Sequence, residues 1–263
     1  LEVWREYARE RYIHNAIFSY LDIRPQNFYR VEADVEGLKF VTARGWEDLS
    51  SLMYVYEELG ISINAGVVGE FLHNEDIAED FAAYYDLYNK YRDDYGINNI
   101  LAGNATSDIY RRMINADYDE RLTVVNLLLD TLNKHFKYAA ELKAYTDSWY
   151  KSIKEKIKAG EDEGAIDKEK AEFSKQAEKL DSVEEQTLAK LENAFDFLEG
   201  SKQEISKEDI GKLDQEMLIF VTGLTTGKES SSFLLVNPCD RYKSYSAMYL
   251  KGGRRNQLLK EME

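Results

Sequence analysis

Residues 118–142 read YDERLTVVNLLLDTLNKHFKYAAEL, and this stretch decides the fold. Its apolar residues recur at alternating steps of four and three, as on the face of a long helix that packs along a second helix. Trp149, Ile153 and Ile157 extend the stripe to a polar turn, GEDEG, at 160–164. The spacing then returns, which predicts an antiparallel helical hairpin whose arms are each about 50 Å or more at ~1.5 Å rise per residue. The positions that define the two stripes are Tyr118, Leu122, Val125, Leu129, Leu132, Phe136 and Ala139, then Phe173, Ala177, Leu180, Val183, Thr187, Leu191, Ala194 and Leu198.

Shorter helices are expected before the hairpin. Apolar residues between Val3 and Leu21 recur at steps of three and four, which predicts one helix that ends at Arg24-Pro25. An extended or looped stretch that holds Gly37 follows. Thr42 is then expected to cap a helix that runs to about Leu59, and two more helices are expected at 66–72 and 77–95.

The segment after the hairpin is also expected to be helical. Gly200 should end the hairpin, and Ser206-Lys-Glu-Asp209 has the pattern of a capping box that opens a helix through Phe220. The apolar run 233–236 is too short to distinguish helix from strand. The predicted fold class is therefore all-α: a small helical bundle, a long antiparallel helical hairpin and a short C-terminal helical region. The corresponding domains are residues 1–98, 99–204 and 205–263.

The composition limits the kinds of partner and the cellular compartment that we expect. The chain has 263 residues, 44% of them hydrophobic, and a formal net charge of -15. This charge disfavours nucleic acid, because basic residues must outweigh acidic ones locally to neutralise phosphates. The basic group Lys251, Arg254 and Arg255 is interpreted as a solvated chain end.

No apolar run approaches the ~18 to 20 residues that cross a bilayer, and the single Cys239 forms no internal disulfide, so we expect a cytoplasmic protein without membrane contact. The first residue is Leu1 and no signal-peptide pattern follows it, which favours a trimmed fragment.

One segment resembles a phosphate-binding loop but has the wrong spacing. Gly223-Leu-Thr-Thr-Gly227-Lys228-Glu229-Ser230 places three residues between the first Gly and the Gly-Lys pair, whereas such a loop needs four and then Ser or Thr. We interpret it as a helix that ends in a Gly-containing turn.

Histidine, cysteine and acidic residues give no metal or nucleophile pattern. His14, His73 and His135 have no second His or Cys at i+3 or i+4, so no zinc site is expected. Cys239 has no His close to it in sequence, and we expect an inert thiol. The acidic pairs at 57–58 and 93–94 are interpreted as surface residues.

Arg44 is the one candidate site residue, and a family resemblance supports it. The stretches Val3-Trp4 to Leu21, Asn27-Phe28-Tyr29 and Phe40-Val-Thr-Ala-Arg44-Gly-Trp-Glu-Asp-Leu-Ser50 resemble the lid of MoxR-type AAA+ ATPases. The family has a Thr-Pro-Arg element whose Arg, the sensor 2 residue, reaches the nucleotide phosphates. That Arg corresponds to Arg44 here, with Ala43 in place of the proline. An alternative is that Arg44 pairs only with Glu47 or Asp48 on its own helix. The resemblance covers about the first 95 residues.

The resemblance implies that a longer parent protein is an ATPase that uses ATP and Mg²⁺, while this chain lacks a phosphate loop and should bind neither by itself. It implies as partners an N-terminal ATPase core, other subunits of a homo-oligomeric ring, and a protein client, often one with a von Willebrand factor A domain. The lid would sense nucleotide and the hairpin would contact a client or partner. The alternative function is a helical scaffold or adaptor in which Arg44 has no nucleotide role.

Overall fold

Helices make up almost all of the fold. The structure is a computed structural model that describes residues 4, 7–8, 11, 13–34, 37–160, 162–201 and 210–251. In these ranges the one sheet has two strands, and the predicted all-α class is confirmed. The chain forms two compact units. Unit 1 takes residues 1–97, 106–130 and 203–220, and unit 2 takes 98–105, 131–202 and 221–263. Each unit combines stretches that are distant in sequence. The three consecutive domains predicted at 1–98, 99–204 and 205–263 therefore stay a prediction.

Unit 1 corrects the first predicted helix. Residues 13 and 14 are not helical, and helix α2 (Asn15–Ile23) begins only after them. His14 causes the break, because its Nδ1 accepts a hydrogen bond from the Ala16 amide at 3.2 Å and its own amide donates to Ser50 Oγ at 2.8 Å. A side-chain acceptor at this position caps the first turn of a helix. The apolar period continues through the break, so the prediction of one helix from Val3 to Leu21 was wrong.

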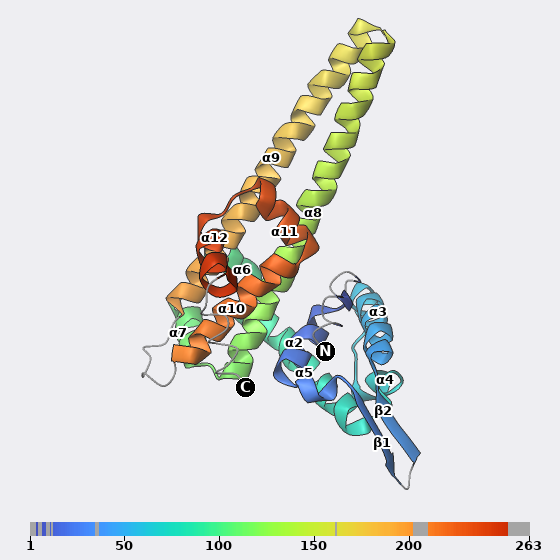
Figure 1. The fold of residues 1–263 in the computed structure, drawn as a ribbon, viewed down its shortest axis with the longest axis vertical. Helices are drawn as coiled ribbons and strands as arrows, with labels where there is room; N and C mark the ends of the chain where they lie inside the picture. The colour runs from blue at the N-terminus through green and yellow to red at the C-terminus, as the bar shows by residue number, and fades with distance from the viewer. Residues whose placement is uncertain are drawn as a thin grey trace. The chain divides into compact units, whose positions relative to one another are not determined.

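A β-hairpin follows α2 and the short 3-10 helix η1 (Pro25–Asn27). Strand β1 (Arg30–Asp34) pairs antiparallel with β2 (Gly37–Val41), in a register that sets Val31 opposite Phe40 (Figure 1). Gly37 has φ 135, in a region that favours glycine. The extended or looped stretch expected around Gly37 is therefore a two-stranded hairpin.

Helices α3 (Ala43–Leu59), α4 (Ala65–Gly69) and α5 (Glu75–Tyr95) complete the N-terminal part of unit 1. The predicted cap of α3 is confirmed, because Thr42 Oγ1 accepts a hydrogen bond from the Gly45 amide at 3.2 Å. The core is aromatic: the Tyr20 ring lies 5.7 Å from that of Trp46 and 5.2 Å from that of Phe81. These three side chains are fully buried and hold α2, α3 and α5 together.

Unit 1 also contains α7 (Ser107–Asn115), the first turns of α8 (Tyr118–Ala159) and most of α10 (Ile210–Thr226). A buried ion pair joins α8 to α10. Arg121 Nε lies 2.6 Å from Glu216 Oε1, and its Nη2 lies 2.8 Å from Oε2. Arg121 also donates to the Met113 carbonyl of α7. One guanidinium therefore connects the consecutive helices α7 and α8 to α10, which is 95 residues away in sequence.

Unit 2 contains most of the predicted hairpin and, next to it, α6 (Ile97–Leu101). Helix α8 runs to Ala159, and α9 (Glu163–Gly200) returns beside it, as Figure 1 shows in green and yellow. Asp162 caps α9 by accepting from the Ala165 amide at 2.9 Å. Near the turn, Glu169 accepts hydrogen bonds from Trp149 Nε1 at 3.0 Å and from Lys156 Nζ at 2.9 Å. The predicted antiparallel hairpin is confirmed.

The C-terminal helices pack on the hairpin within unit 2. They are α11 (Lys228–Val236), α12 (Asp240–Ser246) and the π-helical turn η2 (Ala247–Lys251). The Phe233 ring of α11 lies 5.1 Å from Phe136 of α8, and Tyr245 of α12 stacks on Phe195 of α9 at 5.6 Å. The ambiguous run 233–236 is helical. The capping box predicted at 206–209 and the basic residues Arg254 and Arg255 lie outside the described residues.

Candidate functional site

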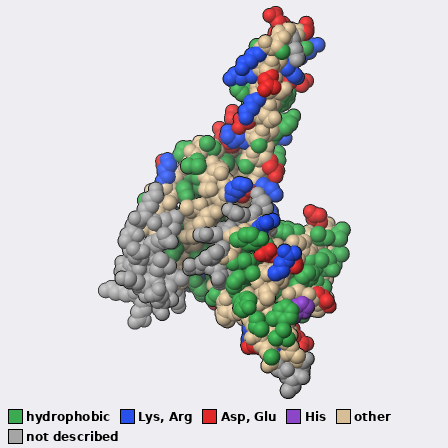
Figure 2. Space-filling view, turned by 45° about the vertical axis from the view of Figure 1, so that its right-hand side comes forward, with side chains coloured by type: hydrophobic (Ala, Val, Ile, Leu, Met, Phe, Trp, Pro, Cys, Tyr) green, Lys and Arg blue, Asp and Glu red, His purple; other side chains and the backbone are tan. Residues whose placement is uncertain are grey.

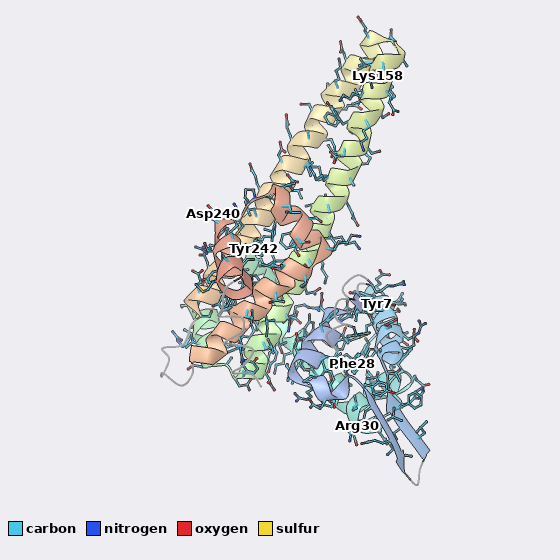
Figure 3. The ribbon with its side chains drawn as sticks, in the orientation of Figure 1. Tyr7, Phe28, Arg30, Lys158, Asp240 and Tyr242 are labelled. Atoms are coloured by element: carbon cyan, nitrogen blue, oxygen red, sulfur yellow. The ribbon has the colours of Figure 1, made fainter. Side chains whose placement is uncertain are left out.

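Arg44 lies in the first turn of α3, where three contacts fix the backbone. Thr42 caps the helix, Gly45 is buried, and Trp46 Nε1 donates to the Phe28 carbonyl at 3.1 Å (Figure 3 labels Phe28). Gly45 permits a close approach, because a Cβ there would lie 2.5 Å from the Phe71 carbonyl oxygen. These contacts fix the backbone on both sides of Arg44, so its side chain projects from a defined position on the surface.

The Arg44 side chain itself is 77% exposed and pairs within its own helix. Its Nε donates to Asp48 Oδ2 at 2.9 Å, one turn along α3. The hydrogen bond and the charge of Asp48 raise the pKa of Arg44, so the guanidinium is always charged. The structure thus contains the intrahelical pair with Asp48 that the sequence analysis gave as one alternative. An exposed guanidinium beside the amides of a helix N-terminus suits an anion, because both carry positive charge.

A second polar group in unit 1 was not foreseen. Glu57 Oε1 accepts a hydrogen bond from the Tyr85 hydroxyl at 2.9 Å and lies 3.1 Å from His14 Nε2. Burial works to raise the pKa of Glu57, but the hydrogen bond and charge of His14, with the contributions of Tyr85 and Arg92, outweigh burial and lower it to about 2. Glu57 was interpreted as surface, and the residue is exposed as a whole, while its side chain is 29% exposed and partly covered by these contacts.

A sequence signal for Glu57 existed. Glu57 follows the buried Met53 by four residues and the buried Ser50 by seven, so it lies on the same side of α3 as these residues, at its exposed end. No such signal marked His14, because its partners are 36 and 43 residues away. The network links the start of α2 to the last turns of α3. We therefore assign it a structural role.

The other sequence candidates have structural surroundings. His73 packs its ring 4.6 Å from Phe40, and burial, together with the charge of Lys190, lowers the pKa of His135. Cys239 donates to Glu192 Oε1 at 3.1 Å, and burial above all raises its pKa to about 11, which keeps the thiol protonated. No group of three or more His, Cys, Asp or Glu residues in the described ranges is placed to hold a metal ion.

The loop-like segment at 223–230 is a junction between two helices. Helix α10 ends at Thr226, and Gly227 stands before α11 as its N-cap residue. Ser230 Oγ donates to the Leu224 carbonyl at 2.7 Å and is fully buried. The interpretation as a helix end with a Gly-containing turn is confirmed. Among the described helices, none is both long enough and apolar enough to cross a membrane.

Comparison with protein families, with curated proteins and with solved structures finds no match for this chain.

Proposed function

We propose that this chain is the C-terminal lid and interaction region of a cytoplasmic MoxR-type AAA+ ATPase with a chaperone-like or assembly role. In this proposal Arg44 senses the nucleotide phosphates, and the hairpin of α8 and α9 contacts a client or partner. ATP and Mg²⁺ would bind to the ATPase core of the parent protein, which would form a homo-oligomeric ring and act on a client such as a von Willebrand factor A domain protein.

One observation carries the proposal: Arg44 is exposed in the first turn of a helix whose start is firmly anchored. An arginine that acts on a nucleotide held by another domain must be accessible and must be positioned by a rigid element. Thr42 and Trp46 provide that element through the contacts at 3.2 and 3.1 Å. The Asp48 pair is no obstacle, because an ion pair between exposed side chains four residues apart on a helix is weak and screened by solvent. A phosphate group therefore competes with it easily.

The pair with Asp48 also supports the second candidate, a helical scaffold or adaptor. If Arg44 serves only its own helix, its role is to stabilise α3. The two candidates differ in what Arg44 does to turnover, so the parent ATPase separates them.

The test is ATP hydrolysis by the parent protein with Arg44→Ala, Arg44→Lys and Asp48→Asn. A sensor role predicts that Arg44→Ala lowers kcat about 10²-fold, the usual effect of removing one preorganised donor. Arg44→Lys should recover part of the loss, and Asp48→Asn should leave kcat unchanged or raised. Thermal melting of residues 1–263 with Arg44→Ala serves as the fold control, and it should match the wild type. Unchanged turnover in Arg44→Ala would leave the scaffold as the remaining candidate.

A further inference from the structure

The outer flank of α8 near the hairpin turn combines exposed apolar side chains with lysines. Tyr150 and Ile157 are 50% and 48% exposed and stand seven residues apart, so they lie on one face about 10.5 Å from each other. Lys154 lies between them, with its Nζ 5.2 Å from the centre of the Tyr150 ring. Lys151 and Lys158 repeat the seven-residue spacing beside them, and Figure 3 places Lys158 at the hairpin tip. We name this surface the arm flank: Tyr150, Lys151, Lys154, Ile157 and Lys158.

The arm flank is basic in a strongly acidic protein. Residues 143–158 contain five lysines and two acidic residues, a local charge of +3, whereas the chain carries -15. Figure 2 shows Lys and Arg side chains along the hairpin surface, interspersed with Asp and Glu. Lys151 and Lys158 form no ion pair with any residue that the structure describes. Exposed aromatic and aliphatic side chains framed by unpaired charge are typical of a surface that binds a partner of opposite charge.

Helix α5 in unit 1 presents the complementary pattern. It holds seven acidic and two basic residues, a net charge of -5 over 21 positions. Glu79, Asp86 and Asp93 are exposed at steps of seven residues and form no ion pair within the described part of the chain. Beside this row lie exposed Ala83 and Leu87, the latter 45% exposed. We name this surface the α5 acidic face: Glu79, Ala83, Asp86, Leu87 and Asp93.

We propose that the arm flank of one copy of this chain docks on the α5 acidic face of a second copy. The two surfaces have opposite charge, and each includes exposed apolar side chains. Their spacing also matches, because Lys151 to Lys158 and Glu79 to Asp86 both span about 10.5 Å. Two different surfaces meet, so each contact leaves one further arm flank and one further α5 acidic face, which either meet each other in a two-fold dimer or bind further copies in rings or open chains. The proposal is independent of Arg44 and of any nucleotide.

The contact is weak and depends on salt. Two helix faces of a few turns bury less than the about 1,200 Å² of a stable interface, so we expect a dissociation constant on the order of 10–100 µM. Raising NaCl from 50 to 500 mM shortens the screening length from about 14 to about 4 Å. The dissociation constant should then rise about tenfold or more.

The experiment is sedimentation velocity of residues 1–263 at 10–300 µM in 50 mM NaCl. The arm variant carries Lys151→Glu and Lys158→Glu, and the α5 variant carries Glu79→Lys and Asp86→Lys. Each variant alone should associate at least about tenfold more weakly than the wild type, because like charges then face each other. An equal mixture of the two should associate again, because the unchanged arm flank of the α5 variant meets the unchanged α5 acidic face of the arm variant, and the two altered surfaces also attract each other.

A matched control changes the same charge elsewhere on the hairpin. Lys168→Glu with Lys175→Glu lies on exposed positions of α9 with the same seven-residue spacing, and it should associate like the wild type. Circular dichroism should show equal helix content in all variants. A wild type that stays monomeric at 300 µM overturns the proposal, as does a control that dissociates like the arm variant. A mixture that stays monomeric overturns it too, since the arm flank would then bind another surface.

Discussion

His14 Nε2 lies 3.1 Å from Glu57 Oε1, across 43 residues of sequence. The other ring nitrogen of His14 accepts a hydrogen bond from the Ala16 amide at 3.2 Å, so the ring bridges this amide and the Glu57 carboxylate. The Tyr85 hydroxyl donates to the same carboxylate oxygen at 2.9 Å. One carboxylate therefore ties the start of α2 to α3 and α5.

This relationship predicts a pH dependence. Glu57 has its pKa lowered from 4.5 to about 2 in the folded chain. The folded carboxylate therefore resists protonation more than the unfolded one. Its contribution to stability is present above pH 4.5 and is lost as the pH falls toward 2. Between pH 6 and pH 3 the wild type should lose about 1 kcal/mol more unfolding free energy than Glu57→Gln, after allowance for solvent screening. Urea unfolding at both pH values measures this, and equal losses in the two proteins would contradict it.

Replacing Gly45 by alanine should destabilise the fold, the opposite of the usual effect in a helix. Alanine in place of glycine usually stabilises a helix by about 0.5–1 kcal/mol. At Gly45, however, a Cβ would lie 2.5 Å from the Phe71 carbonyl oxygen, a backbone atom that cannot move alone. Gly45→Ala should therefore lower the unfolding free energy by about 1–3 kcal/mol. Gly69→Ala is the control, since its nearest neighbour would be 4.0 Å away, and it should be neutral or stabilising in thermal melts. A stabilised Gly45→Ala chain would show that Gly45 and the Phe71 carbonyl are not in such close contact.

The ion pair of Arg121 and Glu216 should be costly to break from one side. The two side chains are 6% and 8% exposed and share two hydrogen bonds of 2.6 and 2.8 Å. Glu216→Ala leaves a buried guanidinium without its carboxylate, so it should lower the unfolding free energy by about 3–5 kcal/mol. Arg121→Met with Glu216→Leu removes both charges and should recover most of this loss. Denaturant titrations compare the variants, and a loss below about 1 kcal/mol in Glu216→Ala would mean that the pair is solvated.

The cap of α3 gives a smaller and more local prediction. Thr42→Ala removes the acceptor for the Gly45 amide and should lower the unfolding free energy by about 1 kcal/mol. Thr42→Ser keeps the hydroxyl and should remain close to the wild type. Thermal melting followed by circular dichroism distinguishes the two variants. Equal losses would show that the threonine methyl group matters and the cap does not.

The long elements could be predicted from the sequence because their signals repeat. The hairpin stripes extend over many turns, and the turn between them has its own polar residues, so chance variation at one position changes little. Thr42 is a local signal, because the residue that starts the helix also provides the capping oxygen. Arg44 was identified through a short motif, and its partner Asp48 is only four residues away.

The missed features depend on partners that are distant in sequence. His14 interrupts a helix through contacts with Ser50 and Glu57, and no pattern near residue 14 announces them. Glu57 stands next to Glu58 in a chain of 49 acidic residues, and nothing in the sequence distinguishes it as the one that contacts His14 and Tyr85. Arg121 and Glu216 are 95 residues apart. Pairs of this kind become visible only when the chain is folded.

That separation sets an order of events during biosynthesis. Unit 1 includes residues 203–220, which follow the whole of α9 in the chain. A ribosome that adds about 5–20 residues per second makes Arg121 roughly 5–20 s before it makes Glu216. Throughout that interval the nascent protein carries a guanidinium whose eventual carboxylate does not yet exist. The Arg121 guanidinium therefore cannot be buried with this partner, and its charge stays with water, until translation has passed residue 216.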